Sequence, residues 1–218
     1  MAAEYLTARR GEAARSTIRR LTSLKAFARW AWKMTVLEDY KAPEAAEAEP
    51  HPLPGGIADV RKMLSVAKRE NHFSLVTLQG FFALRVSEAR AVTAESFDRH
   101  EGQLHVRGKG SKDRRLDYAE TTFELLSVPF TRSLVDGTSL CSLSDAAARA
   151  AIKSVAKLAG IEKDVSSHDL RATCLTELYD RTGDIELVRR FAGHASVKQT
   201  QVYIGSRRKA LREAVSFV

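Results

Sequence analysis

Hydrophobic residues near the N-terminus recur at spacings of three and four, which is the pattern of an amphipathic helix. They lie within residues 16–40 and form a stripe of Ile18, Leu21, Leu24, Ala28 and Ala31. Ser16 and Thr17 both have the side chain of a helix N-cap. We therefore predict a helix that begins at one of these two residues, in a short helical N-terminal unit over residues 1–42. A unit of this size can hardly bury a core alone.

A second and longer set of patterns begins near Gly55 and predicts a larger unit. Apolar residues at helical spacing predict helices over residues 58–70, 72–92 and 144–160. In the last of these, Ser144 is placed as the N-cap and Gly160 as the residue that ends the helix. The apolar stripe of that helix is Ala148, Ile152, Val155 and Ala159. From residue 161 to Tyr203 the pattern is again mainly helical.

Alternation of apolar and polar residues predicts one small antiparallel sheet. Residues 103–107 and 114–118 alternate, and between them lies GKGSKD, whose glycines supply turn conformations. We therefore expect a β-hairpin, and a fold that is mainly α with a small antiparallel β-sheet.

The apolar periodicity stops between the two units, in the segment KAPEAAEAEPHPLPGG. Its prolines and lack of apolar periodicity are typical of a linker, so we predict a linker over residues 43–56 and a folded domain over residues 57–205. The remaining tail, residues 206–218, ends in apolar residues that need a covering surface. Either its own unit or a neighbouring protomer would supply that surface.

Composition narrows the class of protein. The chain has 218 residues, of which 44% are hydrophobic, and a net charge of +8. A packed core is therefore expected. The positive charge predicts an anionic partner, most commonly nucleic acid, with a membrane surface as the competing interpretation. No apolar run approaches the roughly 20 residues of a spanning helix, and the N-terminus lacks the apolar stretch of a signal peptide. We expect a cytoplasmic, nucleoid-associated protein without a membrane partner.

The cysteine content and the glycine-rich turn exclude several classes of site. Cys141 and Cys174 are the only cysteines, which fits small core residues and not a disulfide framework. No Cys/His spacing matches a metal site. The stretch GKGSK looks like a phosphate loop, but it lacks the Walker A spacing and does not open a helix. We expect neither a metal nor a cofactor.

Polar residues that could carry chemistry lie in three places along the chain. Arg85 follows the apolar run LVTLQGFFAL, and Glu88, three residues later, is spaced to orient it. Lys109 lies in the predicted hairpin turn. His168 and Arg171 are three apart at an expected helix start, so their side chains share a face. An arginine fork of this kind matches the geometry of a phosphate.

The third place is the segment that ends at Tyr203. Gly193 predicts a helix stop or a tight turn directly before His194, and Tyr203 ends a polar stretch where a hydroxyl can be presented to a ligand. Taken singly, each of these residues has a more ordinary interpretation, as a cap, an ion-pair member, a turn residue or a packing residue.

Taken in order, these segments resemble the tyrosine recombinase (phage integrase) family. ALRVSEARAV looks like the first arginine box of the family, and LHVRGKGSKDRRLDY like its lysine-bearing hairpin. HDLRATCLTEL looks like its His-x-x-Arg box, and FAGHASVKQTQVYIG like its Gly-His and tyrosine boxes. The resemblance covers about residues 57–205. Ala172 and Ala192 depart from the residues most common in the family, but neither position is catalytic.

The resemblance implies a fold, a reaction and a set of site residues. The fold would be a tyrosine-recombinase catalytic domain, in a small member of the family without an arm-binding domain. The reaction would be site-specific cutting and rejoining of double-stranded DNA through a 3′-phosphotyrosyl intermediate. It would take place in a synaptic assembly of protomers, expected to be a tetramer on two DNA sites, with the tail over residues 206–218 of each protomer packed on a neighbour. The catalytic set would be Arg85, Lys109, His168, Arg171, His194 and Tyr203, supported by Glu88 and Gly193.

Basic residues outside the catalytic set are predicted to contact DNA phosphates. They lie on the N-terminal helix and in the hairpin, and are Arg19, Arg20, Lys25, Arg29, Lys33, Arg107, Lys112 and Arg114. For the helix, a solvated basic face is the alternative. For the whole chain, the alternatives are a noncatalytic DNA-binding regulator on the same scaffold and an enzyme of the type IB topoisomerase kind.

Overall fold

A computed structural model describes residues 14–32, 51–108 and 113–201, with side chains in the first of these segments described for residues 19–31. The chain divides into two units between Ala48 and Glu49, and each is described here by itself. The predicted domain boundaries at residues 42 and 205 fall outside the described residues.

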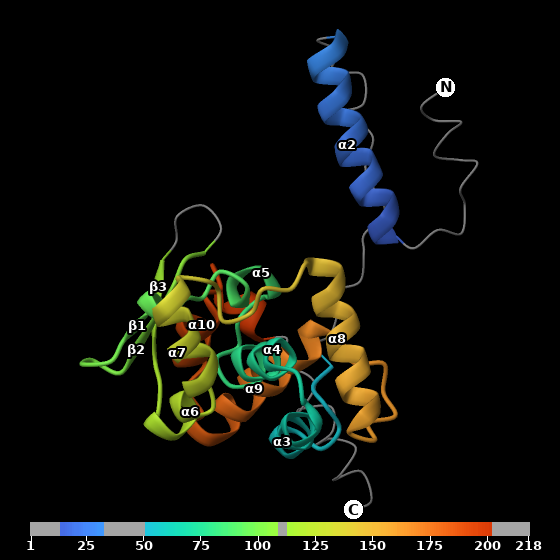
Figure 1. Ribbon diagram of the computed structural model, residues 1–218. Helices are drawn as coiled ribbons and strands as arrows, with labels where there is room; N and C mark the ends of the chain where they lie inside the picture. The colour runs from blue at the N-terminus through green and yellow to red at the C-terminus, as the bar shows by residue number, and fades with distance from the viewer. Residues whose placement is uncertain (1–13, 33–50, 109–112, 202–218) are drawn as a thin grey trace, which may run out of the picture. The chain divides into compact units, whose positions relative to one another are not determined.

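The first unit contributes one described helix, α2 (Ala14–Trp32), coloured blue in Figure 1. Of the predicted apolar stripe, Leu21 and Ala28 are buried and Leu24 is half-buried, whereas Ala31, near the end of the helix, is exposed and does not belong to it. The helix begins at Ala14, so Ser16 and Thr17 lie inside it, and the prediction that one of them is the N-cap is wrong. The residues before Ser16 include Ala14, a strong helix former, and the helix extends through them.

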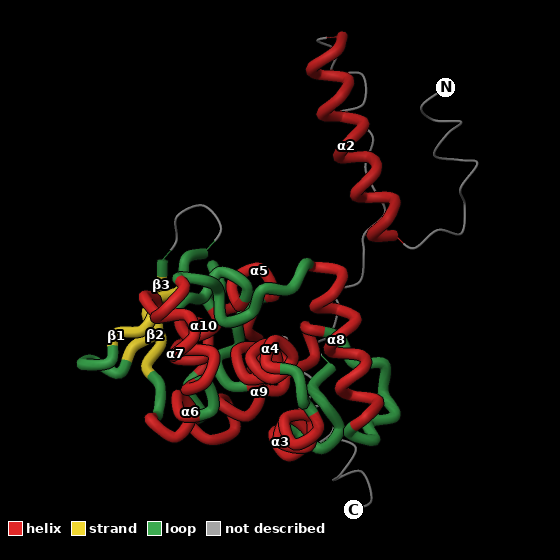
Figure 2. Tube along the Cα trace, viewed as in Figure 1, coloured by secondary structure: helices red, strands yellow, loops and turns green. Residues whose placement is uncertain are grey.

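Helices make up most of the second unit (Figure 2). Two central helices, α4 (Glu70–Gly80) and α9 (Ser167–Thr182), pack against each other. The helices α3 (Ile57–Val66) and α8 (Asp145–Leu158) lie on one side of this pair, and the sheet lies on the other side (Figure 1). Other helices in the described part of this unit are α5 (Val86–Ala89), η1 (Ala94–Ser96), α6 (Glu120–Glu124), α7 (Ser127–Asp136) and α10 (Ile185–Ala192), and residues 197–201 are also helical.

Helix α8 confirms its sequence signals in detail. The Ser144 side chain accepts a hydrogen bond of 3.2 Å from the Ala147 backbone N–H at the start of the helix. Gly160 follows the helix with a φ of 72°, in the left-handed region that glycine adopts without strain. Within the predicted stripe, Ala148 and Ile152 are fully buried.

The sheet has three antiparallel strands in the order β1–β2–β3. The strands β2 (Gln103–Val106) and β3 (Arg114–Asp117) form the predicted hairpin, with Leu104 paired to Leu116. Their side chains alternate: Leu104 and Leu116 are buried, whereas His105 and Arg115 are exposed. Strand β1 (Phe97–Asp98) has only two residues, too short for an alternating pattern to reveal.

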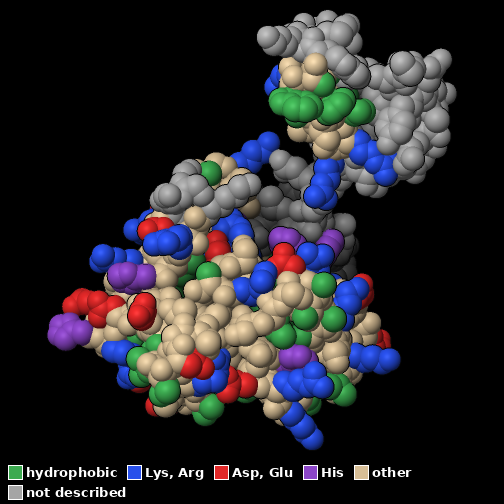
Figure 3. Space-filling model, turned by 45° about the horizontal axis from the view of Figure 1, so that its top comes forward, with side chains coloured by type: hydrophobic (Ala, Val, Ile, Leu, Met, Phe, Trp, Pro, Cys, Tyr) green, Lys and Arg blue, Asp and Glu red, His purple; other side chains and the backbone are tan. Residues whose placement is uncertain are grey.

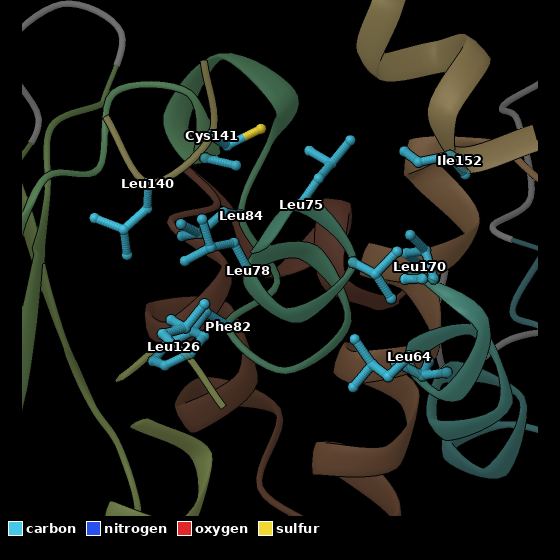
Figure 4. Packing of buried hydrophobic residues seen from close by; sticks show 14 of the residues in the cluster. Leu64, Leu75, Leu78, Phe82, Leu84, Leu126, Leu140, Cys141, Ile152 and Leu170 are labelled. Atoms are coloured by element: carbon cyan, nitrogen blue, oxygen red, sulfur yellow. The ribbon is translucent and has the colours of Figure 1, made fainter. Parts of the chain in front are cut away.

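A cluster of buried hydrophobic residues joins several of these elements (Figure 4). Leu64 from α3, Leu75 and Leu78 from α4, Ile152 from α8 and Leu170 from α9 are buried in one cluster. Burial of side chains of this size contributes roughly 1.5–3 kcal/mol each. The same cluster therefore holds α4 and α9 in fixed positions, and these two helices lead to the polar residues described below.

The segment just before α3 is also fastened to this core. Leu53 is buried, and its backbone N–H donates a 2.8 Å hydrogen bond to the Thr173 hydroxyl in α9. The Lys163 ammonium donates to the backbone carbonyls of His51, at 2.5 Å, and Pro52, at 3.4 Å. Residues 51–53 therefore pack with the second unit, although they fall within the predicted linker.

The helix predicted over residues 72–92 is interrupted. Helix α4 ends at Gly80, and α5 begins at Val86. In between, Ala83 has a φ of 50°, a left-handed conformation that is unusual for a residue other than glycine. Arg85 is extended, with a φ of −68° and a ψ of 157°. The apolar run FFAL is buried nearly throughout, so its periodicity could not reveal the break.

Over the described residues, none of the helices combines the length and the apolar character needed to cross a lipid bilayer.

Candidate active site

The start of α9 is held rigidly, and this fixes the backbone that carries His168 and Arg171. The Asp169 carboxylate accepts hydrogen bonds from the backbone N–H and the hydroxyl of Ser166, at 2.7 and 2.6 Å. It also forms a 2.7 Å ion pair with Lys163. Burial alone would raise the pKa of Asp169, but the hydrogen bonds from Lys163 and Ser166 outweigh it and hold that pKa below its ordinary value. His168, in the first turn, is exposed.

Arg171 joins three parts of the chain that are distant in sequence. Its side chain is buried on the inner face of α9. The guanidinium donates hydrogen bonds to the carbonyl of Ala83, in the interrupted segment after α4, and to the carbonyl of Ala192, at the end of α10, at 2.5 Å. It also lies 3.2 Å from His194 Nε2. The break between α4 and α5 is therefore part of the site, because it supplies an acceptor for this arginine.

Arg85 is held from within its own turn by Glu88. Its backbone N–H donates to Glu88 Oε2 at 2.9 Å, and its guanidinium donates to Glu88 Oε1 at 2.8 Å. These contacts put the Glu88 carboxylate against Arg85, where the sequence spacing places it. The Arg85 side chain remains 44% exposed, so it can still reach a bound molecule.

Glu88 is surrounded by positive charge. Arg114 donates two hydrogen bonds to it, at 3.0 and 2.9 Å, and Arg171 lies 4.0 Å away. Burial by itself would raise the pKa of Glu88, but the hydrogen bonds and charges of Arg114 and Arg85 outweigh burial and lower that pKa to about 2. The carboxylate is therefore ionised at neutral pH and balances part of the charge of the arginines around it.

His194 follows Gly193, which ends α10 with a φ of 64°. The predicted helix stop at Gly193 is confirmed. The His194 ring is buried, with Nδ1 3.0 Å from the Thr200 hydroxyl. Because a guanidinium can only donate, Nε2 accepts from Arg171, and the proton of the neutral ring is on Nδ1. Burial and then the charge of Arg171 lower the pKa of His194 to about 4, so the ring is uncharged at neutral pH.

These side chains meet around two neighbouring hollows. Arg85, His168 and Arg171 line one of about 460 Å³. Arg85 and His194 line another of about 690 Å³. Arg85 belongs to both and so lies at their junction. Histidine side chains lie beside lysine and arginine side chains in the upper part of the larger unit in Figure 3. Two guanidinium groups at one hollow, those of Arg85 and Arg171, are suited to bind an oxyanion such as a phosphate diester.

The remaining predicted site residues divide into three groups. Lys109 and Tyr203, together with Lys33 and Lys112, lie outside the described residues. Arg107 is exposed and lines the second hollow, and on α2 Arg19 and Arg29 are exposed while Arg20 and Lys25 are half-buried. Arg114 differs from expectation, because its guanidinium is turned inward onto Glu88.

Asp169 and Thr200 belong to the site but were not predicted. Asp169 follows Ser166 by three residues, and this capping-box spacing was a usable signal. No pattern in the sequence points to Thr200. Within the described residues, no group of histidine, cysteine, aspartate and glutamate side chains is arranged to hold a metal ion.

Comparison with known proteins gives relatives in one family. Residues 58–209 match the model of the phage integrase family. Tyrosine recombinase XerC of Proteus mirabilis is 31% identical over 155 residues, which make up 66% of this chain and 49% of that protein. Tyrosine recombinase XerC of Corynebacterium glutamicum is 27% identical over 228 residues, 94% of this chain and 72% of that protein. The chain thus spans about half the length of the Proteus relative.

A solved structure agrees with this relationship at the level of the fold. The XerH site-specific recombinase, bound to its difH substrate in a pre-cleavage complex, has a TM-score of 0.74 to this chain at 21% identity. The match covers 99% of this chain and 68% of the XerH chain. Because the family match includes Arg85, His168, Arg171 and His194 and extends over more than half of the chain, the protein belongs to the phage integrase family of tyrosine recombinases.

Proposed function

We propose that the protein is a site-specific DNA recombinase that cuts and rejoins double-stranded DNA through a 3′-phosphotyrosyl intermediate. One observation carries the proposal: Arg85 and Arg171, from different elements, line one hollow together with His168. Family membership and the DNA complex of the XerH relative support the same substrate class.

Arg85 and Arg171 would bind the two non-bridging oxygens of the scissile phosphate. Negative charge on these oxygens grows as the nucleophile attacks, and donors that are already in place stabilise it most. Arg171 is fixed by two backbone carbonyls and Arg85 by Glu88, so neither has to be ordered when DNA binds. Loss of one such donor costs on the order of 3 kcal/mol in comparable sites.

Tyr203 would supply the nucleophile and Lys109 the acid. The phenol oxygen attacks phosphorus, the bond from phosphorus to the 5′-oxygen breaks, and the 3′ end becomes bonded to the tyrosine. His168 would accept the phenol proton, since an unperturbed tyrosine with a pKa of about 10 holds it at neutral pH. Lys109 would give a proton to the leaving 5′-oxygen. Attack by a 5′-hydroxyl of another strand reverses these steps, so no ATP is needed.

His194 would support the segment that leads to Tyr203. Its Nδ1 contacts Thr200, which precedes Tyr203 by three positions in the sequence. Its Nε2 accepts from Arg171. The imidazole would therefore link the phosphate-binding arginine to the nucleophile segment.

We further propose that protomers act together on DNA, as a tetramer on two sites, with the tail after Ser206 docked on a neighbour. The unit over residues 1–42 would widen the contact with the duplex through the basic residues of α2. A DNA substrate is consistent with the expectation of a nucleoid-associated protein.

The test is covalent capture. The purified chain is incubated with sheared DNA from around its gene, and complexes that survive denaturing detergent are collected and sequenced. We expect one enriched site with an inverted repeat. Tyr203→Phe should abolish the covalent product and leave binding within about threefold, because only the attacking oxygen is removed.

Two outcomes would replace the proposal. Sequence-specific binding without any covalent product from the wild-type chain would identify a noncatalytic regulator. Covalent capture together with relaxation of supercoiled DNA that lacks a second site, and without strand exchange, would identify a topoisomerase-like enzyme.

A further inference from the structure

Arg114 lies at the first position of β3, directly after the hairpin turn. Its side chain is only 11% exposed. Both terminal nitrogens donate to Glu88, Nη1 to Oε1 at 3.0 Å and Nη2 to Oε2 at 2.9 Å. The third nitrogen, Nε, donates to the Phe191 carbonyl at 3.2 Å. Each of the three guanidinium nitrogens thus donates to a protein acceptor.

The first of these acceptors, the Glu88 carboxylate, also holds Arg85. The Glu88 oxygens that accept from Arg114 also accept from the Arg85 backbone and guanidinium. A paired fork fixes the plane of the carboxylate, whereas a single hydrogen bond leaves it free to rotate. The orientation of Arg85, which is 44% exposed, therefore depends on a carboxylate that Arg114 holds in place.

The second acceptor, the Phe191 carbonyl, lies in the backbone just before His194. Phe191 belongs to the last turn of α10, whose C-cap is Gly193. A Cβ added at Gly193 would lie 3.0 Å from Arg114 Nη1 and 3.1 Å from its Cδ. The Arg114 side chain thus packs directly against the backbone turn that sets the position of His194.

We infer that Arg114 is a positioning residue for DNA cleavage, which aligns Arg85 through Glu88 and His194 through the end of α10. The inference rests on the proposed function of this site. It also explains why a hairpin arginine expected to contact DNA turns its guanidinium inward onto Glu88. Displacement of reacting groups by about 1 Å can cost on the order of 100-fold in rate.

The experiment measures cleavage and binding separately, on a nicked duplex of the site recovered by covalent capture. Arg114→Ala should lower the single-turnover rate of covalent product formation by about 10- to 100-fold, with DNA affinity within about threefold of wild type. Arg115→Ala is the matched control. It removes one positive charge at the next position of the same strand, where the side chain is exposed on the other face of the sheet, and it should keep the wild-type rate.

A double-mutant cycle tests the route through Glu88. If Arg114 acts through that carboxylate, Arg114→Ala combined with Glu88→Gln should lose about as much rate as the worse single variant. A loss equal to the product of the two single losses would overturn this route. A general structural defect would lower the melting temperature and the DNA affinity as well, so both are measured for every variant.

Arg114→Lys provides a second variant if Arg114→Ala does not fold. Lysine keeps the charge but cannot form the paired contact, so the rate should still fall by about 10-fold with the fold intact. The inference would be overturned if Arg114→Ala cleaved DNA as fast as Arg115→Ala does. Where the alanine variant does not fold, the same comparison is made with Arg114→Lys. The wild-type reaction separates this outcome from failure of the proposed function: if the wild-type chain forms no covalent product, the proposed function itself falls.

Discussion

Single residues in the site differ in how much freedom they keep. Arg171 and Arg114 are fixed by buried acceptors, whereas Arg85 is held at one end and exposed at the other. His168 is exposed at the start of α9. The site thus combines enclosed donors with more exposed side chains, and the proposed roles of individual residues can be tested separately.

Lys109→Ala should slow cleavage of ordinary DNA because the leaving 5′-oxygen then lacks a proton donor. A substrate with sulfur at the bridging 5′ position should restore most of the rate, since a thiolate leaves without protonation. Arg85→Ala should show no such rescue, because its proposed partner is a non-bridging oxygen. Single-turnover rates on the two substrates check this. An unrescued Lys109→Ala would identify Lys109 as a phosphate ligand and not an acid.

The buried His194 should make stability depend on pH. Its pKa is about 4 in the folded chain and about 6.5 when unfolded. Between these values the unfolded chain binds more protons, so the free energy of unfolding falls as the pH drops from about 6.5 to 4, by at most about 3 kcal/mol. Glu88, with a pKa of about 2, adds a further loss only below about pH 4.5.

Denaturant melts at several pH values measure this dependence. The variant His194→Gln keeps a polar side chain without a titrating ring and should be flatter than wild type between pH 6.5 and 4.5. His72 also has a pKa lowered by burial, and the comparison of variant with wild type removes its contribution. Identical slopes would show that His194 does not remain neutral in the folded chain.

Some residues of the site could be predicted from the order of their motifs along the sequence, and others could not. Arg85, His168, Arg171 and His194 stand in motifs whose order is distinctive. Arg114 was predicted as a DNA contact, although alternation in β3 puts it on the same face as the buried Leu116. The alternation could therefore have predicted that the Arg114 side chain faces the interior.

At the level of elements, the helix ends at Gly183 and Gly193 offer a direct test of the site. Gly183 ends α9 and Gly193 ends α10, both in the left-handed region with φ of 67° and 64°. A Cβ at Gly183 would meet nothing within 4 Å, whereas one at Gly193 would crowd Arg114. The two glycines therefore form a matched pair that separates backbone strain from side-chain crowding.

Gly183→Ala should cost about 1–2 kcal/mol, the strain of a left-handed alanine. Gly193→Ala should cost the same and about 1 kcal/mol or more in addition for crowding, and it alone should lower the cleavage rate. Thermal melts and the covalent-product assay check the pair. Equal cleavage rates in the two variants would show that the turn before His194 tolerates a shift.

Sequence periodicity recovered the long regular elements and missed the irregular ones. Helix α8, the hairpin and the stripe of α2 were predicted because each buries one face only. The break between α4 and α5 was missed because its side chains are apolar and mostly buried. This break depends on contacts from α9, since Arg171 binds the Ala83 carbonyl, and a local pattern cannot contain such a contact.

At the scale of the whole molecule, the excess of positive charge should dominate DNA affinity. The logarithm of affinity should fall linearly with the logarithm of salt concentration, with a slope of about 0.9 for each phosphate contact. A chain without residues 1–42 should bind more weakly and with a shallower slope, because the basic residues of α2 are lost. Binding titrations at several salt concentrations measure both. A slope unchanged by the deletion would show that α2 does not contact DNA phosphates and that its basic face is simply solvated.

The contacts of residues 51–53 with Thr173 and Lys163 determine where the second unit can be cut to give an independently folded fragment. A fragment that starts at Ile57, the first residue of α3, would leave a void where Leu53 was buried and would deprive Lys163 of two carbonyl acceptors. A void of that size costs roughly 2–5 kcal/mol. We expect a fragment over residues 49–218 to unfold cooperatively, and one over residues 57–218 to melt several degrees lower. Protease digestion of the whole chain should accordingly leave a resistant core that still contains Leu53.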